Sequence, residues 1–327
     1  MYAIPEPLPD IGVTVIAQRI LSEVNVGIPF AVNSFNRQLL FCTVRIETVG
    51  VGSKGSGTGF IYSASHDGNT VTPVLVTNKH VLAGSERCTV FFIQGDEEAP
   101  HLDKPAVGYG TACNPGPWVG HPDPGIDVAV MPLGPVINDL IAAGRRPFYR
   151  TIPPSACPPE DALGNLDVAE PVTFVGYPNN LYDSAHNTPI IRQGATATPI
   201  QLDWNGLPQF LIDASVFPGS SGSPVFTTLR TSYFSGNSIQ LGANTPYFLG
   251  IVAAVYQRQA TGEIVLAASQ PRVLYNDMIH LGIVYKWTSI EEAVDEMCRK
   301  YGLTRTRLND APESAAEISE ETPAGEV

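Results

Sequence analysis

The sequence has 327 residues, of which 43% are hydrophobic and 16% are charged, with 30 glycines and 29 prolines. The low charged share and a Gly and Pro content short of the roughly 25–30% of low-complexity chains favour a loop-rich globular β protein. A net charge of −13 argues against nucleic acid as a partner, and five cysteines without a Cys-x-x-Cys pair argue against a disulfide framework or zinc ribbon.

The first twenty residues lack the basic start and apolar run of a signal peptide. The longest clearly apolar stretch, 248–256, is about half a membrane span. We therefore expect a soluble, cytoplasmic protein with free thiols and no membrane partner.

Apolar residues at helical spacing predict a first helix over 10–24. From about 38 to 270 short apolar or alternating runs, broken by Gly, Pro, Asn and Asp, predict many short strands of an all-β barrel or sandwich. The runs are 39–49, 57–64, 72–81, 88–94, 127–133, 170–178, 209–216, 223–228, 247–256 and 263–269. Two loop-rich stretches separate them, at 95–126 and 144–169, and the second has the character of a linker between barrels.

Residues 289–302 return to helical spacing and predict a C-terminal helix. Thr288 and Glu291 fit a capping box, and Gly302 fits a C-terminal cap. Beyond it, residues 309–327 hold six acids and no base. A composition of this kind predicts a disordered tail, which we expect to be dispensable for activity.

The sharpest local motif is PGSSGSPVF at 218–226, with Ser221 between Gly219 and Gly222. A seryl nucleophile needs backbone N–H groups aimed at the developing oxyanion, and glycine lets the chain turn without a Cβ in the way. The alternative interpretation is that this motif is an ordinary Gly/Ser/Pro loop without a catalytic role.

Two further residues make the motif chemically meaningful. His80 ends the apolar run of 72–81 after a Thr-Asn-Lys turn, and Asp127 opens the apolar run of 127–133. Each alone is usually a surface residue or a cap. In the order His, Asp, Ser they form the set that nucleophilic acyl transfer requires.

With these motifs the sequence resembles the chymotrypsin/trypsin-like serine peptidases, in the bacterial branch of HtrA-like and glutamyl endopeptidase-type proteases. The resemblance implies an all-β fold of two six-stranded antiparallel barrels with an N-terminal and a C-terminal helix. It divides the chain into a helical extension (1–37), a first barrel with His80 and Asp127 (38–150), a linker and second barrel with Ser221 (151–288), the C-terminal helix (289–302) and an acidic tail (303–327).

The resemblance also implies a serine endopeptidase acting on protein or peptide substrates, without metal or organic cofactor. His80 is the expected general base, Asp127 orients it, and the N–H groups of Gly219 and Ser221 form the oxyanion hole. The substrate pocket is expected at Ser215, Phe217, Val252, Ala253 and Ala254. Ser215 stands where an acid would favour Lys or Arg substrates, so a small or apolar P1 residue, the one on the acyl side of the cut bond, is expected.

Other interpretations are weaker. GVGSKG at 50–55 matches a dinucleotide motif, but no helix is predicted after it; the hydrolase motif G-x-S-x-G fails at Ser223. His121 with Asp123 resembles a metal site of only two ligands. The serious rival is a pseudoprotease that uses the double barrel as a protein-binding scaffold.

A cytoplasmic endopeptidase must also avoid cutting neighbouring proteins, through narrow specificity, a closed cleft or a regulatory partner protein.

Overall fold

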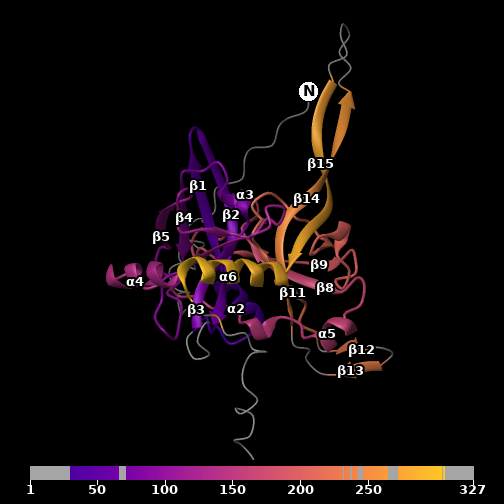
Figure 1. Ribbon diagram of the computed structural model, residues 1–327, viewed down its shortest axis with the longest axis horizontal. Coiled ribbons are helices and arrows are strands. Elements are labelled where there is room, and N and C mark those ends of the chain that lie inside the picture. The colour runs from indigo at the N-terminus through magenta and orange to yellow at the C-terminus, as the bar shows by residue number, and fades with distance from the viewer. Residues whose placement is uncertain are drawn as a thin grey trace, which may run out of the picture.

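Two β units lie side by side in the computed structural model (Figure 1). The structure describes residues 30–65, 71–230, 232–235, 238–241, 246–263, 272–303 and 305. In Figure 1 the first unit is indigo to purple, the second is pink to orange, and a yellow C-terminal helix crosses between them.

The first unit is a seven-stranded antiparallel sheet in the order β5-β4-β1-β2-β3-β7-β6. Its strands are β1 (Thr43–Gly50), β2 (Ser53–Ser65), β3 (Val71–Thr77), β4 (Arg87–Phe92), β5 (Val107–Ala112), β6 (Val119–Gly120) and β7 (Ala129–Pro132). The predicted six-stranded barrel is not found here, since no ladder among the described residues joins β5 to β6. The connection between these edges contains Pro115 and Pro117, which have no N–H to donate.

The second unit is the closed six-stranded barrel that was predicted, in the order β10-β15-β14-β11-β8-β9. The pairing of Ile212 with Thr196 closes it between β10 and β9. The strands are β8 (Pro171–Gly176), β9 (Ile190–Thr196), β10 (Gln209–Asp213), β11 (Pro224–Thr227), β14 (Phe248–Glu263) and β15 (Arg272–Lys286). The hairpin of β12 (Ser232–Ser235) and β13 (Ser238–Leu241) stands apart, and β14 and β15 extend beyond the barrel (Figure 1).

Helices replace part of the predicted strand and loop structure. The predicted strand at 39–49 begins only at Thr43, because α2 (Phe35–Cys42) precedes it, capped by the Ser34 side chain. The run after β7 forms α4 (Gly134–Ala142) and buries Val136, Ile137 and Leu140. The remaining short helices are α3 (Lys79–Leu82), α5 (Glu160–Asn165) and 3-10 turns at Pro154–Ala156, Pro178–Asn180 and Trp204–Gly206.

The C-terminal helix α6 (Trp287–Tyr301) matches the predicted position, and Gly302 ends it at a φ of 66°. The predicted capping box is wrong, because the helix starts earlier, with Lys286 at its N-cap and no side-chain cap. The carboxylate of Glu291 instead accepts hydrogen bonds from Tyr62 and Arg305.

An aromatic core joins the two units. Phe248 of the barrel lies 5.4 Å from the ring of Phe60 on β2 and 5.3 Å from the ring of Phe226 on β11. Ile290 and Val294 of α6 are fully buried against the same cluster. Burial of this apolar surface, at roughly 25 cal/mol per Å², holds the two units at a fixed relative position, and the cleft between them is therefore a fixed feature of the fold.

The predicted helix at 10–24 and the acidic tail at 309–327 lie outside the described residues. Among the helices that the structure describes, none has both the length and the apolar character that a membrane span requires.

Candidate active site

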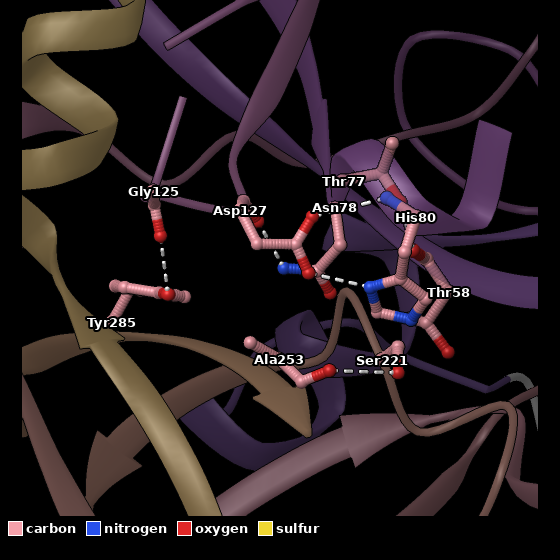
Figure 2. A network of polar contacts seen from close by, with 9 residues as sticks. All are labelled: Thr58, Thr77, Asn78, His80, Gly125, Asp127, Ser221, Ala253 and Tyr285. Atoms are coloured by element: carbon pink, nitrogen blue, oxygen red, sulfur yellow. Dashed lines mark hydrogen bonds and ion pairs between the residues drawn. The ribbon is translucent and has the colours of Figure 1, made fainter. Parts of the chain in front are cut away.

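His80 and Asp127 meet beside the ends of two paired strands of the first sheet. His80 lies in α3, directly after β3, and Asp127 lies just before β7, the strand that pairs with β3. The Nδ1 of His80 is 2.5 Å from Asp127 Oδ2, and the His80 backbone N–H donates to Asp127 Oδ1 at 3.0 Å (Figure 2). A proton on Nδ1 that is bonded to the carboxylate leaves Nε2 as the free acceptor of the ring.

The loop that carries Asp127 is fixed from three sides. Asn78 Nδ2 donates to the Asp127 carbonyl at 2.6 Å, and the Tyr285 hydroxyl donates to the Gly125 carbonyl at 3.0 Å. Burial raises the pKa of the Tyr285 phenol, and the nearby Asp127 carboxylate adds to the shift. The phenol therefore remains a neutral donor at ordinary pH.

His121 provides the third attachment of this loop. Its side chain is only 2% exposed; Nδ1 accepts from the Asp123 N–H at 3.0 Å, and Nε2 lies 2.8 Å from Glu292 on α6. Sequence inspection considered His121 with Asp123 as a weak metal pair, and the described residues contain no cluster of three metal-ligating side chains. The histidine instead ties the Asp127 loop to the C-terminal helix.

Ser221 lies on the loop between β10 and β11, in the same cleft as His80 and Asp127. Its Oγ donates to the carbonyl oxygen of Ala253 on β14 at 3.1 Å (Figure 2). Within the described residues, no hydrogen bond joins Ser221 Oγ to His80. The Ser221 hydroxyl is thus hydrogen-bonded to a main-chain carbonyl and not to the histidine.

The peptide between Pro218 and Gly219 presents its N–H to the cleft. The Asn179 N–H donates to the Pro218 carbonyl at 2.6 Å, which turns that carbonyl toward the 177–180 segment. In a trans peptide the N–H points the opposite way from the C=O. Neither the Gly219 nor the Ser221 N–H meets a backbone acceptor among the described residues, so both donors stay free.

Glycine is required at this turn for steric reasons. Gly219 has a φ of 85°, and an added Cβ would lie 2.6 Å from the Tyr177 carbonyl oxygen. Gly222 has a φ of 92°, and its Cβ would lie 1.7 Å from the Thr58 carbonyl oxygen. Both values of φ lie in the region that favours glycine.

Thr58 on β2 is a site residue that sequence reasoning missed. Its backbone N–H donates to the Ser221 carbonyl at 2.9 Å, and its Oγ1 donates to the Gly219 carbonyl at 2.9 Å while accepting from the Tyr177 N–H at 3.0 Å. Thr58 therefore links the first sheet to both sides of the turn that carries Ser221. No signal in the sequence marks it, because these three partners are more than a hundred residues away.

A cleft of about 580 Å³ between the two units contains these groups. Its lining includes His80, Asp127, Gly219 and Ser221. The rest of the lining on the first unit comes from the β1–β2 hairpin, from α3 and from the residues after it: Thr48, Ser53, Lys54, Gly55, Ser56, Val81, Ala83 and Ser85.

Comparison with known protein families decides the family. The model of the trypsin-like peptidase domain matches residues 57–230, which is more than half of the chain. The chain belongs to the trypsin-like peptidase family. This confirms the resemblance seen in the sequence, and with it the prediction of a serine endopeptidase.

Solved structures of proteases are similar to this trypsin-like peptidase at low identity. The serine endoprotease from Yersinia pestis is 16% identical, with a TM-score of 0.45 and coverage of 82% of this chain and 68% of that one. The HtrA-type protease AlgW, solved with a tripeptide, is 15% identical, with a TM-score of 0.41 and coverage of 81% and 62%. The active form of the Rv3671c protease from M. tuberculosis is 15% identical, with a TM-score of 0.39 and coverage of 90% and 94%. A search of curated proteins gave no significant match.

The expected substrate-pocket residues of this trypsin-like peptidase are only partly in the cleft. Phe217 and Ala253 line it, as do Val216 and Pro218 beside them. Val252 is fully buried in the barrel core, and Ser215 is half-buried but does not line the cleft. The side chain of Ala254 lies outside the described residues.

The GVGSKG run of 50–55, considered as a weak dinucleotide motif, forms the turn of the β1–β2 hairpin. The turn places Ser53, Lys54 and Gly55 on the cleft rim. No helix N-terminus follows it, so the phosphate-binding interpretation fails on geometry.

Proposed function

We propose that this trypsin-like peptidase cuts peptide bonds through Ser221, His80 and Asp127. The observation that carries the proposal is the His80–Asp127 contact of 2.5 Å in the cleft that also holds the Ser221 hydroxyl. In Figure 2 the ring edge that carries the second nitrogen of His80 faces the side on which Ser221 lies. This is the arrangement that a base needs to act on a seryl nucleophile.

The proposed reaction has two half-reactions. The Ser221 oxygen bonds to the substrate carbonyl carbon while its proton passes to His80 Nε2, and the carbonyl electron pair moves onto oxygen. The tetrahedral intermediate expels the amine, which takes the proton from His80. Water then repeats the sequence on the acyl-enzyme and releases the carboxylic acid and free Ser221.

The remaining groups supply charge stabilisation. The Gly219 and Ser221 N–H groups donate to the oxyanion, a contribution of about 10²–10³ in rate for each donor in measured cases. Asp127 holds the histidine tautomer and stabilises the imidazolium.

Ser221 must first leave Ala253. The net free energy of a hydrogen bond in a protein is about 0.5–1.5 kcal/mol, so this reorientation lowers the reactive population by roughly two- to thirteenfold. A penalty of this size slows the enzyme without silencing it. The hydrogen bond from Ser221 to Ala253 is also the observation that favours the second candidate function. That function is a catalytically silent double-barrel scaffold that binds protein.

A fluorophosphonate probe separates the two functions. We expect the folded wild type to be labelled at Ser221, with the label lost in Ser221→Ala and after denaturation. Ser220→Ala, which removes the adjacent serine, is the matched control and keeps the label. Folded protein that neither takes the label nor cuts any member of a peptide library would instead establish the scaffold.

A further inference from the structure

Phe217 on the cleft wall is flanked by two basic side chains. The guanidinium of Arg192 on β9 lies over the Phe217 ring at 4.8 Å from its centroid. On another side, the His280 ring meets Phe217 edge to face, with centroids 6.4 Å apart. Phe217 of the expected P1 pocket is therefore in contact with an arginine and a histidine, neither of which lines the cleft itself.

Arg192 has no carboxylate partner within the part of the chain that the structure describes. Three other arginines that are buried or half-buried have one: Arg45 contacts Glu47, Arg230 contacts Glu170 and Arg305 contacts Glu291. Arg192 is half-buried, and burial lowers its pKa. A guanidinium stays charged in proteins, so a cation without a carboxylate partner among the described residues is in contact with Phe217 of the cleft lining.

The placement of His280 is built into the backbone. It has a φ of 61°, which is uncommon for a residue other than glycine, and its carbonyl accepts from the Ala214 N–H at 2.9 Å. Ala214 belongs to the segment that leads to Phe217. The bond thus holds the imidazole beside the pocket wall, where its side chain is exposed.

We infer that the expected P1 pocket takes an acidic substrate side chain, with the Arg192 guanidinium as its counter-charge; this rests on the proposed peptidase function. Guanidinium groups bind carboxylates through two parallel hydrogen bonds, a geometry that lysine lacks. Because Arg192 contacts the cleft-lining Phe217 and does not itself line the cleft, we expect the longer Glu side chain to reach it better than Asp. The proposal replaces the small or apolar P1 preference expected from Ser215.

The test is a set of peptides identical except at P1, which is Glu, Asp, Gln, Leu or Lys. For the wild type we expect kcat/KM for Glu to exceed that for the isosteric Gln at least tenfold, and to exceed that for Asp. Arg192→Gln is expected to lower kcat/KM for the Glu peptide at least tenfold while leaving the Leu peptide within about twofold.

Two other variants serve as controls for charge and stacking. Arg150→Gln removes an arginine that is stacked on Phe148 at 4.5 Å and lines a different cavity; the Glu/Gln ratio should stay at the wild-type value. Lys54→Gln removes a positive charge from the part of the cleft lining that the first unit supplies. It should change cleavage of all P1 peptides alike, whereas Arg192→Gln should act on acidic P1 residues alone.

The outcomes distinguish the two proposals. If Ser221 is labelled by fluorophosphonate but Glu is cut no better than Gln, the acidic pocket is wrong and the peptidase stands. Equal losses for Glu and Leu in Arg192→Gln would also overturn it. If Arg192→Gln fails to fold, two measurements on the wild type decide. One is the ratio of kcat/KM for the Glu and Gln peptides, and the other is the inhibition of peptide cleavage by aldehydes that carry Glu or Gln at P1. Without labelling or cleavage, both proposals fail.

Discussion

The Oγ1 of Thr58 donates to the carbonyl oxygen of Gly219 at 2.9 Å and connects the first sheet with the turn that carries Ser221. The same oxygen accepts from the Tyr177 N–H at 3.0 Å, and Thr58 is fully buried. Two main-chain groups thus depend on one hydroxyl. The conformation of the turn that carries Ser221 is therefore set partly by a residue that does not line the cleft.

Thr58→Val keeps the shape of this side chain and removes both hydrogen bonds. Leaving buried polar groups unpaired costs about 1–3 kcal/mol, and the loss falls on the turn that carries Ser221 and the proposed oxyanion donors. We expect kcat to drop roughly ten- to hundredfold, with KM within about threefold of the wild type. Thr58→Ser retains the hydroxyl and should recover most of kcat; a valine variant with wild-type kcat would contradict the positioning role.

The glycines of the turn that carries Ser221 allow two effects to be separated: steric overlap of an added Cβ and strain from a positive φ. Gly222→Ala would place a Cβ 1.7 Å from a carbonyl oxygen, whereas Gly206→Ala, at a comparable φ of 73°, meets nothing within 4 Å. We expect Gly206→Ala to cost about 1–2 kcal/mol of stability and to keep full fluorophosphonate labelling. Gly222→Ala should lose labelling and melt at a lower temperature than Gly206→Ala. Equal behaviour of the two would show that φ alone matters.

The parts of the site that could be predicted from the sequence are those that local pattern encodes. PGSSGSPVF needs its glycines for backbone reasons that act within a few residues, and His80 and Asp127 each adjoin an apolar strand. Thr58, Arg192 and His280 carry no such signal. Strand pairing and hairpin folding bring them into contact with residues that line the cleft, so their neighbours are set by topology.

Errors in the fold prediction have a similar cause. Residues 39–49 form one apolar run, and periodicity alone does not separate a short buried helix from a strand; α2 ends at Cys42, and β1 starts at Thr43. For α4, the spacing of Val136, Ile137 and Leu140 was a readable helical signal. The open edge of the first sheet depends on a connection with two prolines, whose effect on barrel closure needs the three-dimensional arrangement.

The contact between His121 and Glu292 is expected to support the position of Asp127. Glu292→Ala leaves the buried imidazole without its partner, which should lower the free energy of unfolding by about 1–3 kcal/mol and kcat several-fold, with KM unchanged. Glu292→Gln keeps an acceptor oxygen and should stay close to the wild type.

Glu296→Ala is the matched control on the same helix. Glu296 pairs with Arg299, whose side chain is 75% exposed, and such surface pairs contribute about 0–1 kcal/mol. Chemical denaturation measures the free energy of unfolding of each variant, and steady-state kinetics measure its kcat and KM. A kcat that falls equally in Glu292→Ala and Glu296→Ala would assign the effect to α6 as a whole and not to the histidine contact.

Two truncations test where the C-terminal segment stops being structural. Arg305 donates to Asp295 at 2.8 Å and contacts Glu291, whose carboxylate also accepts from Tyr62. Burial raises the pKa of the Tyr62 phenol, and the neighbouring Cys157 and Glu291 add to the shift, so Tyr62 is a neutral donor and Arg305 supplies the positive charge beside Glu291.

A chain ending at 308 keeps Arg305 and should match the wild type in melting temperature and in peptide hydrolysis, as expected for a dispensable acidic tail. A chain ending at 303 loses Arg305 and leaves Glu291 without its cation. Breaking a buried pair costs about 3–5 kcal/mol; because Glu291 keeps 21% of its side chain exposed, we expect roughly 2–3 kcal/mol. Arg305→Ala in the full chain should reproduce this loss, since the guanidinium and not the chain length is responsible. Equal stability of the chains ending at 303 and 308 would remove Arg305 from the folded core.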